Sequence, residues 1–492
     1  MTLASSLGLE LQQSSVVHAA GAEWALARAA AGRRLVVSTA SDLPVLDEIE
    51  GERHAVPGGV TIVGPTTAHN AAVLRRHLPS LVPVPLGLRT SAGLGDRLGL
   101  ATPGHVRAIR AAAPEIAPVF AQQSMREMAR TGRSPREVID AATWGAFEAG
   151  WTEAVGADAD HVKAVEEVDA CLSAGFTQFT IDPGAFVNTA VAAGDEPAVR
   201  AGFAALPWDR LEDSAAGLLS RYAGRRVDAD GWLVAFDAET ATRAAVKYGA
   251  AVAHVAALYR HLRAQADGRP FEVEVSVDET AEPTSHAEHV FIAEELRRLG
   301  VRWVALAPRF AGRFEKGVDY IGDLAEFERH LEGHAAIARA LGPYKLSLHS
   351  GSDKFSLYPL VARHARGLVH LKTAGTSYLE ALRVIASIDQ PLFAEIYGFA
   401  RERYDTDRAS YHVSAELAKA PAHADGAAPS ALLDQFHARQ VLHVTFGSVL
   451  SAVDADGQPR FARRILAVLE RFPDRYAEAL EAHFVRHLAP FA

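Results

Sequence analysis

Polar and apolar residues alternate along residues 344–349, which read YKLSLH. Because successive side chains of a β-strand point to opposite faces, Lys345, Ser347 and His349 share one face of a predicted strand, and the residues between them are apolar. The polar face carries an amine, a hydroxyl and an imidazole. Such a face either meets water or lines a site.

Short β-like segments alternate with helical patterns over most of the chain, which is the order of a parallel sheet with crossover helices. Eight strands are predicted after residue 80: 82–88, 116–123, 176–182, 271–278, 302–308, 344–349, 367–372 and 441–446. Helices are predicted at 286–300, 323–342 and 376–387. This pattern predicts a (β/α)8 TIM-like barrel, whose active site lies where the carboxyl ends of the strands meet the following loops.

The chain outside these segments predicts two additions to the barrel. Residues 1–80 are expected to form an accessory α/β layer, with strands at 34–40 and 60–67 around an Ala-rich helix. Residues 81–492 then form the TIM-like barrel catalytic domain, with a helical insertion near 185–270 that includes a loop-like stretch at 208–232. A further helix is predicted in PLFAEIYGFARERYDTD, followed by a loop at 419–430.

Composition narrows the classes of function. The net charge of -10 is spread along 492 residues without long like-charge runs, so we expect no nucleic-acid or membrane partner and a small molecule instead. The single cysteine, Cys171, excludes an internal disulfide and a thiolate zinc site, which leaves His, Asp and Glu to hold any metal. Without a signal-peptide pattern or a run of 18 apolar residues, a cytoplasmic protein is expected. The sequence leaves the oligomeric state open.

The split between polar and apolar faces recurs in three other predicted strands. Their polar residues are Gln178, Thr180 and Asp182 in 176–182, Glu272, Glu274, Ser276 and Asp278 in 271–278, and His370 and Lys372 in 367–372. In a barrel the apolar faces pack on the helices, so these polar faces point inward. Each unpaired buried charge costs several kcal/mol, so a metal, a polar ligand or a network of paired charges must offset it.

Imidazoles and carboxylates at strand ends are suitable ligands for a divalent ion such as Mn, Co, Ni or Zn. We expect His349 and His370 to be metal ligands, with Glu274 or Asp182 completing the set. The alternative is that each histidine is a hydrogen-bonded core residue, and that the interior is an ion-pair network without catalysis.

The loops that follow the strands add polar groups at the same end of the predicted barrel. Arg309, Arg313 and Lys316 follow the strand at 302–308 and suit a carboxylate or phosphate, although a solvated loop is an equal alternative. Candidate substrate contacts elsewhere are Gln122 and Ser124 after the strand at 116–123, and Asp353, with Lys354, in the small-residue loop HSGSDKFS.

Other motifs give less support to a site. The glycines of SAGLGDRLGLATPGH lack the dinucleotide fingerprint, and neither a Gly-x-Ser-x-Gly elbow nor a P-loop occurs. Histidine pairs in HAEH (286–289) and HLEGH (330–334) lie on predicted outer helices without the HExxH glutamate, so solvated helix faces are expected there.

A family resemblance is carried by long motifs in one order between about residue 85 and the C-terminus. They are FTIDP (179–183), EVSVDET (274–280), PTSHAEH (283–289), LAPRFAGRFEKGVDYIGD (306–323), KLSLHSGSDKFSLYP (345–359), HLKTAGTSYLEALR (370–383) and LHVTFG (442–447). Together they resemble the tagaturonate epimerase family. The resemblance implies a barrel enzyme that depends on a divalent metal and interconverts D-tagaturonate and D-fructuronate, ketohexuronates that differ at C4.

Chemistry favours a retro-aldol route for such a reaction, because a proton on C4 lies two carbons from the C2 ketone and its removal gains no enolate stabilisation. We expect Asp182 and Glu274 to be the bases, a metal to act as Lewis acid, and Lys372, Arg309 or Lys316 to bind the substrate carboxylate. Two alternatives remain: a metal-dependent aldolase acting on a keto sugar acid, and a sugar-acid binding protein without catalysis.

Overall fold

The computed structural model describes residues 7–29, 32–189, 196–424 and 429–492. Within them, eight parallel strands close into a barrel in the order β10-β13-β14-β15-β16-β7-β8-β9. The strands are β7 (Ser91–Gly93), β8 (Ala117–Ser124), β9 (Gly156–Val162), β10 (Gln178–Ile181), β13 (Glu272–Ser276), β14 (Ala305–Ala307), β15 (Lys345–Leu348) and β16 (Val369–Lys372). Neighbours in the barrel are also neighbours in the chain, so the predicted TIM-like barrel is confirmed.

Two of the eight predicted strands are wrong. Residues 82–88 form no strand, because Pro83 and Pro85 lack the N–H that a ladder requires. Residues 441–446 lie instead at the end of α15 (Phe436–Val444) and the start of α16 (Phe446–Ser451). A short apolar run that is buried on all sides does not distinguish a strand from a helix, which explains the second error.

Two strands of the barrel, β7 and β9, were not predicted from the sequence. β7 has only three residues, and β9 reads GADADHV, whose Gly, Ala and Asp residues have low β propensity. β9 nevertheless alternates, with Asp158 and Asp160 in contact with interior groups and Ala157 and Ala159 in the hydrophobic core. Its carboxylates are central to the site described below.

The predicted crossover helices are confirmed. They are α10 (His286–Arg298), α11 (Leu324–Ala340) and α13 (Thr376–Ile388), and the predicted helix beyond them is α14 (Gln390–Asp407). Ser285 caps α10 through a capping box with Glu288, and Asp323 caps α11. Around the other strands lie α2 (Thr102–Ala112), α3 (Met125–Thr131), α4 (Pro135–Glu148), α5 (Val165–Ala174) and α12 (Tyr358–Ala365).

The region between β10 and β13 holds the predicted helical insertion. Its described elements are α6 (Glu196–Ala204), α7 (Trp208–Leu211), α8 (Ala215–Tyr222), the hairpin β11 (Arg226–Ala229) and β12 (Trp232–Ala235), and α9 (Ala238–Ala266). The prediction of a loop at 208–232 is therefore wrong, since α7, α8 and β11 lie there. Ser214 caps α8, a local signal that the sequence interpretation overlooked.

The N-terminal region is a six-stranded antiparallel sheet in the described part of the chain. Its strands are β1 (Glu10–Leu11), β2 (Val17–Ala19), β3 (Ala22–Ala29), β4 (Gly32–Thr39), β5 (Glu52–Val56) and β6 (Gly59–Pro65). The predicted strands at 34–40 and 60–67 are β4 and β6, but they pair directly, with a short 3-10 helix and β5 between them rather than the predicted α-helix. The helix α1 (Ala68–His77) follows the sheet.

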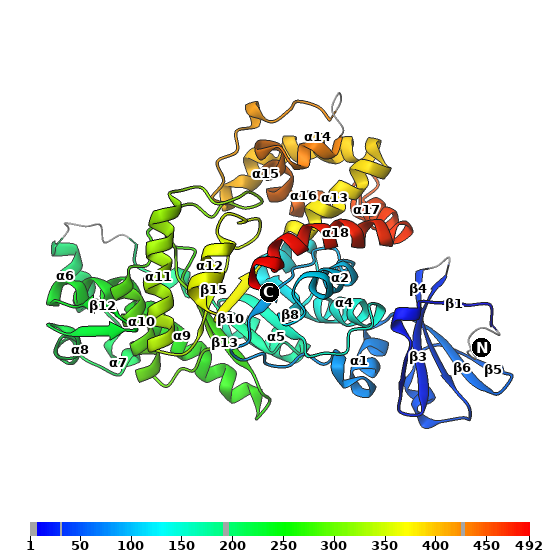
Figure 1. Ribbon diagram of the computed structural model, residues 1–492, viewed down its shortest axis with the longest axis horizontal. Coiled ribbons are helices and arrows are strands. Elements are labelled where there is room, and N and C mark those ends of the chain that lie inside the picture. Colours follow the sequence, from blue (N-terminus) through cyan, green and yellow to red (C-terminus); the bar gives the residue numbers. More distant parts are fainter. Residues whose placement is uncertain (1–6, 30–31, 190–195, 425–428) are drawn as a thin grey trace.

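Figure 1 shows the N-terminal sheet and the insertion on opposite sides of the barrel, with the C-terminal helices along a third side. These are α14 to α16, α17 (Ala462–Arg471) and α18 (Pro473–Leu488). They reach the loops at the carboxyl ends of the strands, because Gln440 donates to Glu315 and Arg439 donates to the Gly317 carbonyl. Of the predicted loop at 419–430, residues 425–428 lie outside the described residues. Among those described, none of the helices combines the length and apolar composition of a membrane span.

Candidate active site

The barrel interior is built around one buried lysine. Lys372 Nζ lies 2.8 Å from Asp158 Oδ2, 2.8 Å from Asp160 Oδ1 and 3.1 Å from Glu274 Oε1. Burial opposes the charge on the ammonium, but these carboxylates hold the pKa of Lys372 well above its usual value. Three carboxylates around one ammonium leave an excess of negative charge in the upper part of the barrel.

His349 lies directly above this cluster, at the end of β15. Its Nδ1 is 3.2 Å from Glu274 Oε1, and its Nε2 is 3.2 Å from Asp160 Oδ1. Burial would lower the pKa of the imidazole, but Asp278 and Asp160 raise it to about 10. The surrounding carboxylates therefore favour a cation at this position.

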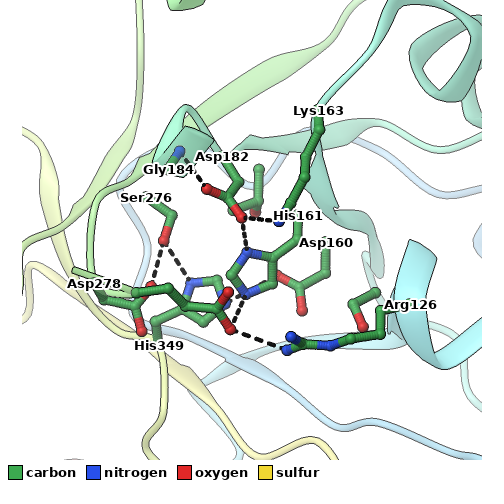
Figure 2. A network of polar contacts seen from close by, with 12 residues as sticks. Arg126, Asp160, His161, Lys163, Asp182, Gly184, Ser276, Asp278 and His349 are labelled. Carbon is green, nitrogen blue, oxygen red and sulfur yellow. Dashed lines mark hydrogen bonds and ion pairs between the residues drawn. The ribbon is translucent and has the colours of Figure 1, made fainter. Parts of the chain in front are cut away.

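His161, at the end of β9, is held by a carboxylate in the same way. Its Nδ1 lies 2.8 Å from Asp182 Oδ2, whose other oxygen accepts the backbone N–H of Gly184 at 2.8 Å. Lys163 also pairs with Asp182, at 2.9 Å. Burial opposes ionisation of Asp182, yet His161 and Lys163 hold its pKa well below the usual range. His161 has a positive φ of 53°, which turns its ring toward His349, with 4.2 Å between ring centroids (Figure 2).

Asp160, His161 and His349 form a buried group whose ligand atoms all lie within 4.8 Å of one another. In each imidazole Nδ1 faces a carboxylate, which leaves Nε2 as the ligand atom. Metal-binding histidines commonly have this arrangement, because the carboxylate fixes the tautomer and the ring orientation. Two imidazoles and one carboxylate, with space beyond them, are a donor set of the kind found in catalytic sites for divalent metals.

His370, the other predicted ligand, lies one layer deeper. The sheet register pairs it with Ser347, so His349 is two residues farther along the barrel, a rise of about 6.6 Å. His370 Nδ1 shares a hydrogen bond with Ser91 Oγ at 2.8 Å, and burial lowers the pKa of its ring to about 3. In the described part of the chain, His370 belongs to no group of three side chains able to hold a metal.

Two neighbouring cavities open above the group. The deeper one, of about 30 Å³, is lined by Asp160, His161 and His349, and the outer one, of about 220 Å³, shares His349 and Lys316 with it. Gln122 and Ser124, predicted to touch substrate, both line the deeper cavity. Gln122 Nε2 donates to Asp160 Oδ2 at 3.0 Å, whereas Ser124 Oγ caps α3 by accepting the Glu127 N–H.

The other predicted substrate contacts are distributed unevenly. Lys316 lines both cavities, and Arg309 lines the outer one alone. Asp353 lines neither, since it is buried against the C-terminal helices, 2.9 Å from Arg439 and 3.1 Å from His483. The predicted carboxylates Asp182 and Glu274 also stand behind the histidines and outside the cavity walls.

A profile of the UxaE tagaturonate epimerase family matches residues 12–491. This chain belongs to the tagaturonate epimerase family. The resemblance inferred from sequence motifs is therefore confirmed. A relative from Thermotoga maritima, named tagaturonate/fructuronate epimerase, is 45% identical over 423 residues, which are 85% of this chain and 84% of the relative.

Crystal structures of one family member resemble this structure over almost the whole chain. The native fructuronate-tagaturonate epimerase UxaE from Cohnella laeviribosi is 36% identical, with a TM-score of 0.92 over 99% of this chain and 99% of that one. A complex of the same enzyme with two glycerols is 35% identical, with a TM-score of 0.93 over 100% and 99%. The N-terminal sheet and the insertion are thus part of the fold that this chain shares with the Cohnella laeviribosi enzyme.

Sequence interpretation missed the carboxylates and the histidine of β9. Its alternation of Asp158 and Asp160 with alanines was the available signal, but alanine is a poor marker of a buried strand face. Glu279 and Arg97, which line the outer and the deeper cavity respectively, follow strand ends and carry no periodic signal. Loop residues of this kind are found only when the strand that precedes them has been located.

The expectation that the histidine pairs on α10 and α11 are solvated is wrong. His289 and His334 are both 0% exposed, and their Nδ1 atoms share a hydrogen bond of 2.8 Å. Tyr344 OH pairs with His289 Nε2, and His334 Nε2 donates to the Thr284 carbonyl. His330 Nδ1 accepts the Ala311 N–H, so its Nε2 carries a proton and donates to the same carbonyl. These rings form a neutral hydrogen-bond chain between helices.

Proposed function

We propose that this chain is a divalent-metal-dependent 4-epimerase that interconverts D-tagaturonate and D-fructuronate. The observation that supports it is the grouping of Asp160, His161 and His349 below a polar cavity, in a chain of the tagaturonate epimerase family. The Thermotoga maritima and Cohnella laeviribosi relatives carry the names of this activity. The enzyme would act on a small sugar acid in the cytoplasm.

The residues present suit a divalent metal. The buried donor set contains two neutral-capable imidazoles and one carboxylate, and the carboxylate excess around Lys372 favours an added cation. We propose Asp160, His161 and His349 as its ligands, a set that keeps His349 and replaces the expected His370 and carboxylate, Glu274 or Asp182, with two residues of β9. A bound Mn, Co, Ni or Zn ion would supply Lewis acidity at a carbonyl or hydroxyl oxygen of the substrate.

We assign Asp182 and Glu274 positioning roles. Each faces the Nδ1 of one histidine, at 2.8 Å for Asp182 and 3.2 Å for Glu274. A neighbouring lysine, Lys163 or Lys372, favours the ionised form of each carboxylate. Because neither lines the cavities, we propose that they act on the reaction through His161 and His349. This role differs from the direct base function expected from the sequence.

Glu279 is the proposed base on one wall of the cavity. It lines the outer cavity, its Oε1 is 3.9 Å from His161 Nε2, and it pairs with Arg126 at 2.9 Å. Burial would raise the pKa of this carboxyl, but His161 and Arg126 lower it to about 2, so Glu279 is ionised at neutral pH.

The reaction that these groups suit is retro-aldol cleavage and re-addition. A base removes the C4 hydroxyl proton, the C3–C4 bond breaks, and its electron pair moves toward the C2 carbonyl to give an enediolate and an aldehyde. The aldehyde then rotates, the C3–C4 bond re-forms on its other face, and the proton returns to the new C4 oxygen. Atoms and electrons balance without an external oxidant or reductant.

The test combines metal analysis with product identification. Purified protein is assayed for bound metal, stripped with a chelator, and incubated with D-tagaturonate before and after Mn, Co, Ni or Zn is restored, with chromatography of the sugar acids. We expect D-fructuronate only with metal present. Full activity of metal-free protein would exclude metal dependence, and accumulation of free aldehyde instead of the epimer would indicate an aldolase.

Substrate deuterated at C4 tests the chemical route. Retro-aldol chemistry never breaks the C4–H bond, so the label should remain in the epimerised product. Exchange of the label into water would contradict this route and support proton abstraction at carbon. Replacement of Glu279 by Gln should reduce kcat by about 100-fold or more if this carboxylate is a base, since general base catalysis contributes typically 10²- to 10⁴-fold.

A further inference from the structure

Most charged side chains around the active-site cavity are grouped by sign, although Glu127 and Glu315 line the deeper cavity beside Arg97 and Lys316. Acidic side chains follow β10 and β13, where Asp182, Asp278 and Glu279 surround His161 and His349. Figure 2 shows this half, with Asp182 and Asp278 on either side of the two rings. Basic side chains follow β7 and β14 on the other half, where Arg97 and Lys316 line the deeper cavity.

Arg97 is held by Glu127 and Phe446 in a conformation that leaves one guanidinium nitrogen without a hydrogen-bond partner among the described residues. The side chain is buried, with the residue 5% exposed. Its Nε donates to Glu127 Oε1 at 2.8 Å, and its Nη2 donates to the same oxygen at 2.5 Å. Its guanidinium lies over the Phe446 ring, 3.5 Å from the centroid. Among the described residues, Nη1 has no hydrogen-bond partner. A buried guanidinium with one unpartnered nitrogen on a cavity wall is arranged to receive an acceptor from a ligand.

Two other donors on this side of the cavity are also available. Ser352 Oγ, in the loop after β15, has no hydrogen-bond partner in the described chain. Lys316 Nζ donates to Ser350 Oγ at 3.3 Å and forms no ion pair with a described carboxylate. Arg97 Nη1, Lys316 Nζ and Ser352 Oγ thus combine two cations and a hydroxyl, the chemistry that recognises a carboxylate.

The other cations that line the deeper cavity already have partners within the protein. Lys372 is surrounded by three carboxylates, and Arg126 pairs with Glu279. Lys354 lines the deeper cavity, but its Nζ donates to three backbone carbonyls, those of Glu315, Val318 and Ser352. Lys354 therefore fixes the loop that carries Lys316 and has no donor directed to a ligand.

The position in the barrel agrees with this chemistry. β15 and β16 are the seventh and eighth barrel strands in chain order, and Ser352 and Ala374 of their loops line the cavity. In TIM barrels the loops after these two strands frequently bind phosphate groups, and Ser352 is the donor of the three that lies in one of them.

We propose that Arg97, Lys316 and Ser352 form a subsite that binds the C6 carboxylate of the sugar acid and makes the enzyme prefer ketohexuronates to neutral ketohexoses. The assignment of a sugar acid rests on the proposed function. The orientation follows: the carboxylate end of the substrate lies on the basic half of the cavity, and the ketone end lies toward Asp160, His161 and His349. In the retro-aldol route the same contacts retain the C4–C6 aldehyde fragment while it rotates.

The experiment compares two ligands that differ only at C6. Isothermal titration calorimetry on the metal-loaded protein measures the Kd of D-tagaturonate and of D-tagatose, which has a primary alcohol in place of the carboxylate. We expect the wild-type protein to prefer the acid. Lys316→Met, Arg97→Lys and Ser352→Ala should each weaken binding of the acid, by about 10- to 100-fold for the two cations, as for a hydrogen bond to a charged group. The Kd of D-tagatose should change by less than about threefold.

The variants separate a binding role from a structural one. Ser352→Ala and Lys316→Met remove atoms with few protein partners, so they keep the test open if Arg97→Lys fails to fold. Arg75→Lys is the matched control, because Arg75 is an arginine with 11% of its side chain exposed that pairs with Asp140 at 2.7 Å, away from both cavities. It should leave the ratio of the two Kd values unchanged.

Each outcome bears on one proposal. The subsite would be overturned if the variants weakened binding of the acid and of the neutral sugar equally, or if the ratio of the two Kd values were unchanged in the folded variants. It would also be overturned if the wild-type protein showed no preference for the acid. Selective binding of the acid by a wild-type protein that forms no epimer would overturn the proposed function and leave the subsite intact.

Discussion

Asp182→Asn should weaken metal binding by changing the tautomer of His161. The carboxylate accepts the Gly184 N–H through Oδ1 and faces His161 Nδ1 through Oδ2. In the variant, the amide oxygen keeps the bond to Gly184, and the amide nitrogen then faces His161. Two donors cannot pair, so His161 Nδ1 must become the acceptor and its proton moves to Nε2. The Nε2 lone pair that we propose as the metal ligand is then no longer available.

The expected magnitude follows from the contacts. Loss of a carboxylate behind a metal-binding histidine typically costs 10- to 100-fold in metal affinity or activity, which corresponds to about 1.4 to 2.7 kcal/mol. The upper part of this range is expected here, because the Asp182 side chain is only 3% exposed. In addition, no other described residue accepts a hydrogen bond from His161 Nδ1 in place of Asp182. Lys163, which is half-exposed, can turn toward solvent.

The assay is a competition titration of metal-stripped protein against a chelator of known affinity, together with kcat at saturating metal. Lys163→Met is the control, because it removes a half-exposed ion pair, worth about 0 to 1 kcal/mol, and keeps the bond between Asp182 and His161. It should change the metal affinity by less than about threefold. Unchanged metal affinity and turnover in Asp182→Asn would refute the role of His161 as a ligand.

Two further predictions concern the interior and the histidine chain. Glu274→Gln removes the carboxylate between Lys372 and His349, so kcat should fall about 10- to 100-fold while circular dichroism stays native. Near-normal turnover would contradict the positioning role. His289 has a pKa lowered by burial from 6.5 to about 3, so the unfolded chain takes up its proton first as the pH falls. Its stabilising contribution is therefore complete above pH 6.5 and is lost between pH 6.5 and 3, by up to about 1.4 kcal/mol per pH unit. Urea unfolding of wild type and His289→Gln at pH 7, 6 and 5 should show a smaller loss in the variant; equal losses would contradict this.

The sequence predicted which faces of the strands point inward. Lys345, Ser347 and His349 are all buried in the barrel, as period-two alternation indicated, and so are the polar residues of β10, β13 and β16. The reason is that a strand whose apolar face packs against the helices must place its polar face toward the barrel interior. The alternation fails as a guide where the strand is short or built of small residues, as in β7 and β9.

The proposed metal ligands could not be identified from strand faces alone, because a face says nothing about depth. His349 and His370 both point inward, but the register of β15 and β16 sets them about two residues apart along the barrel axis. Register depends on where each strand begins, and that depends on long-range packing. Because β9 was not predicted as a strand, its residues Asp160 and His161, which lie next to His349, were absent from the predicted site.

Access to the cavities also separates the structural from the chemical groups of the interior. Away from the cavities, Glu272 accepts the N–H groups of Leu86 and Gly87, and Lys345 shares Ser91 with His370. These groups have partners within the protein and line neither cavity. Next to the deeper cavity, the carboxylates around Lys372 exceed their cationic partners, and His349 faces the cavity. Substitutions in the first set should therefore reduce stability, whereas those in the second should reduce turnover and metal affinity in a folded protein.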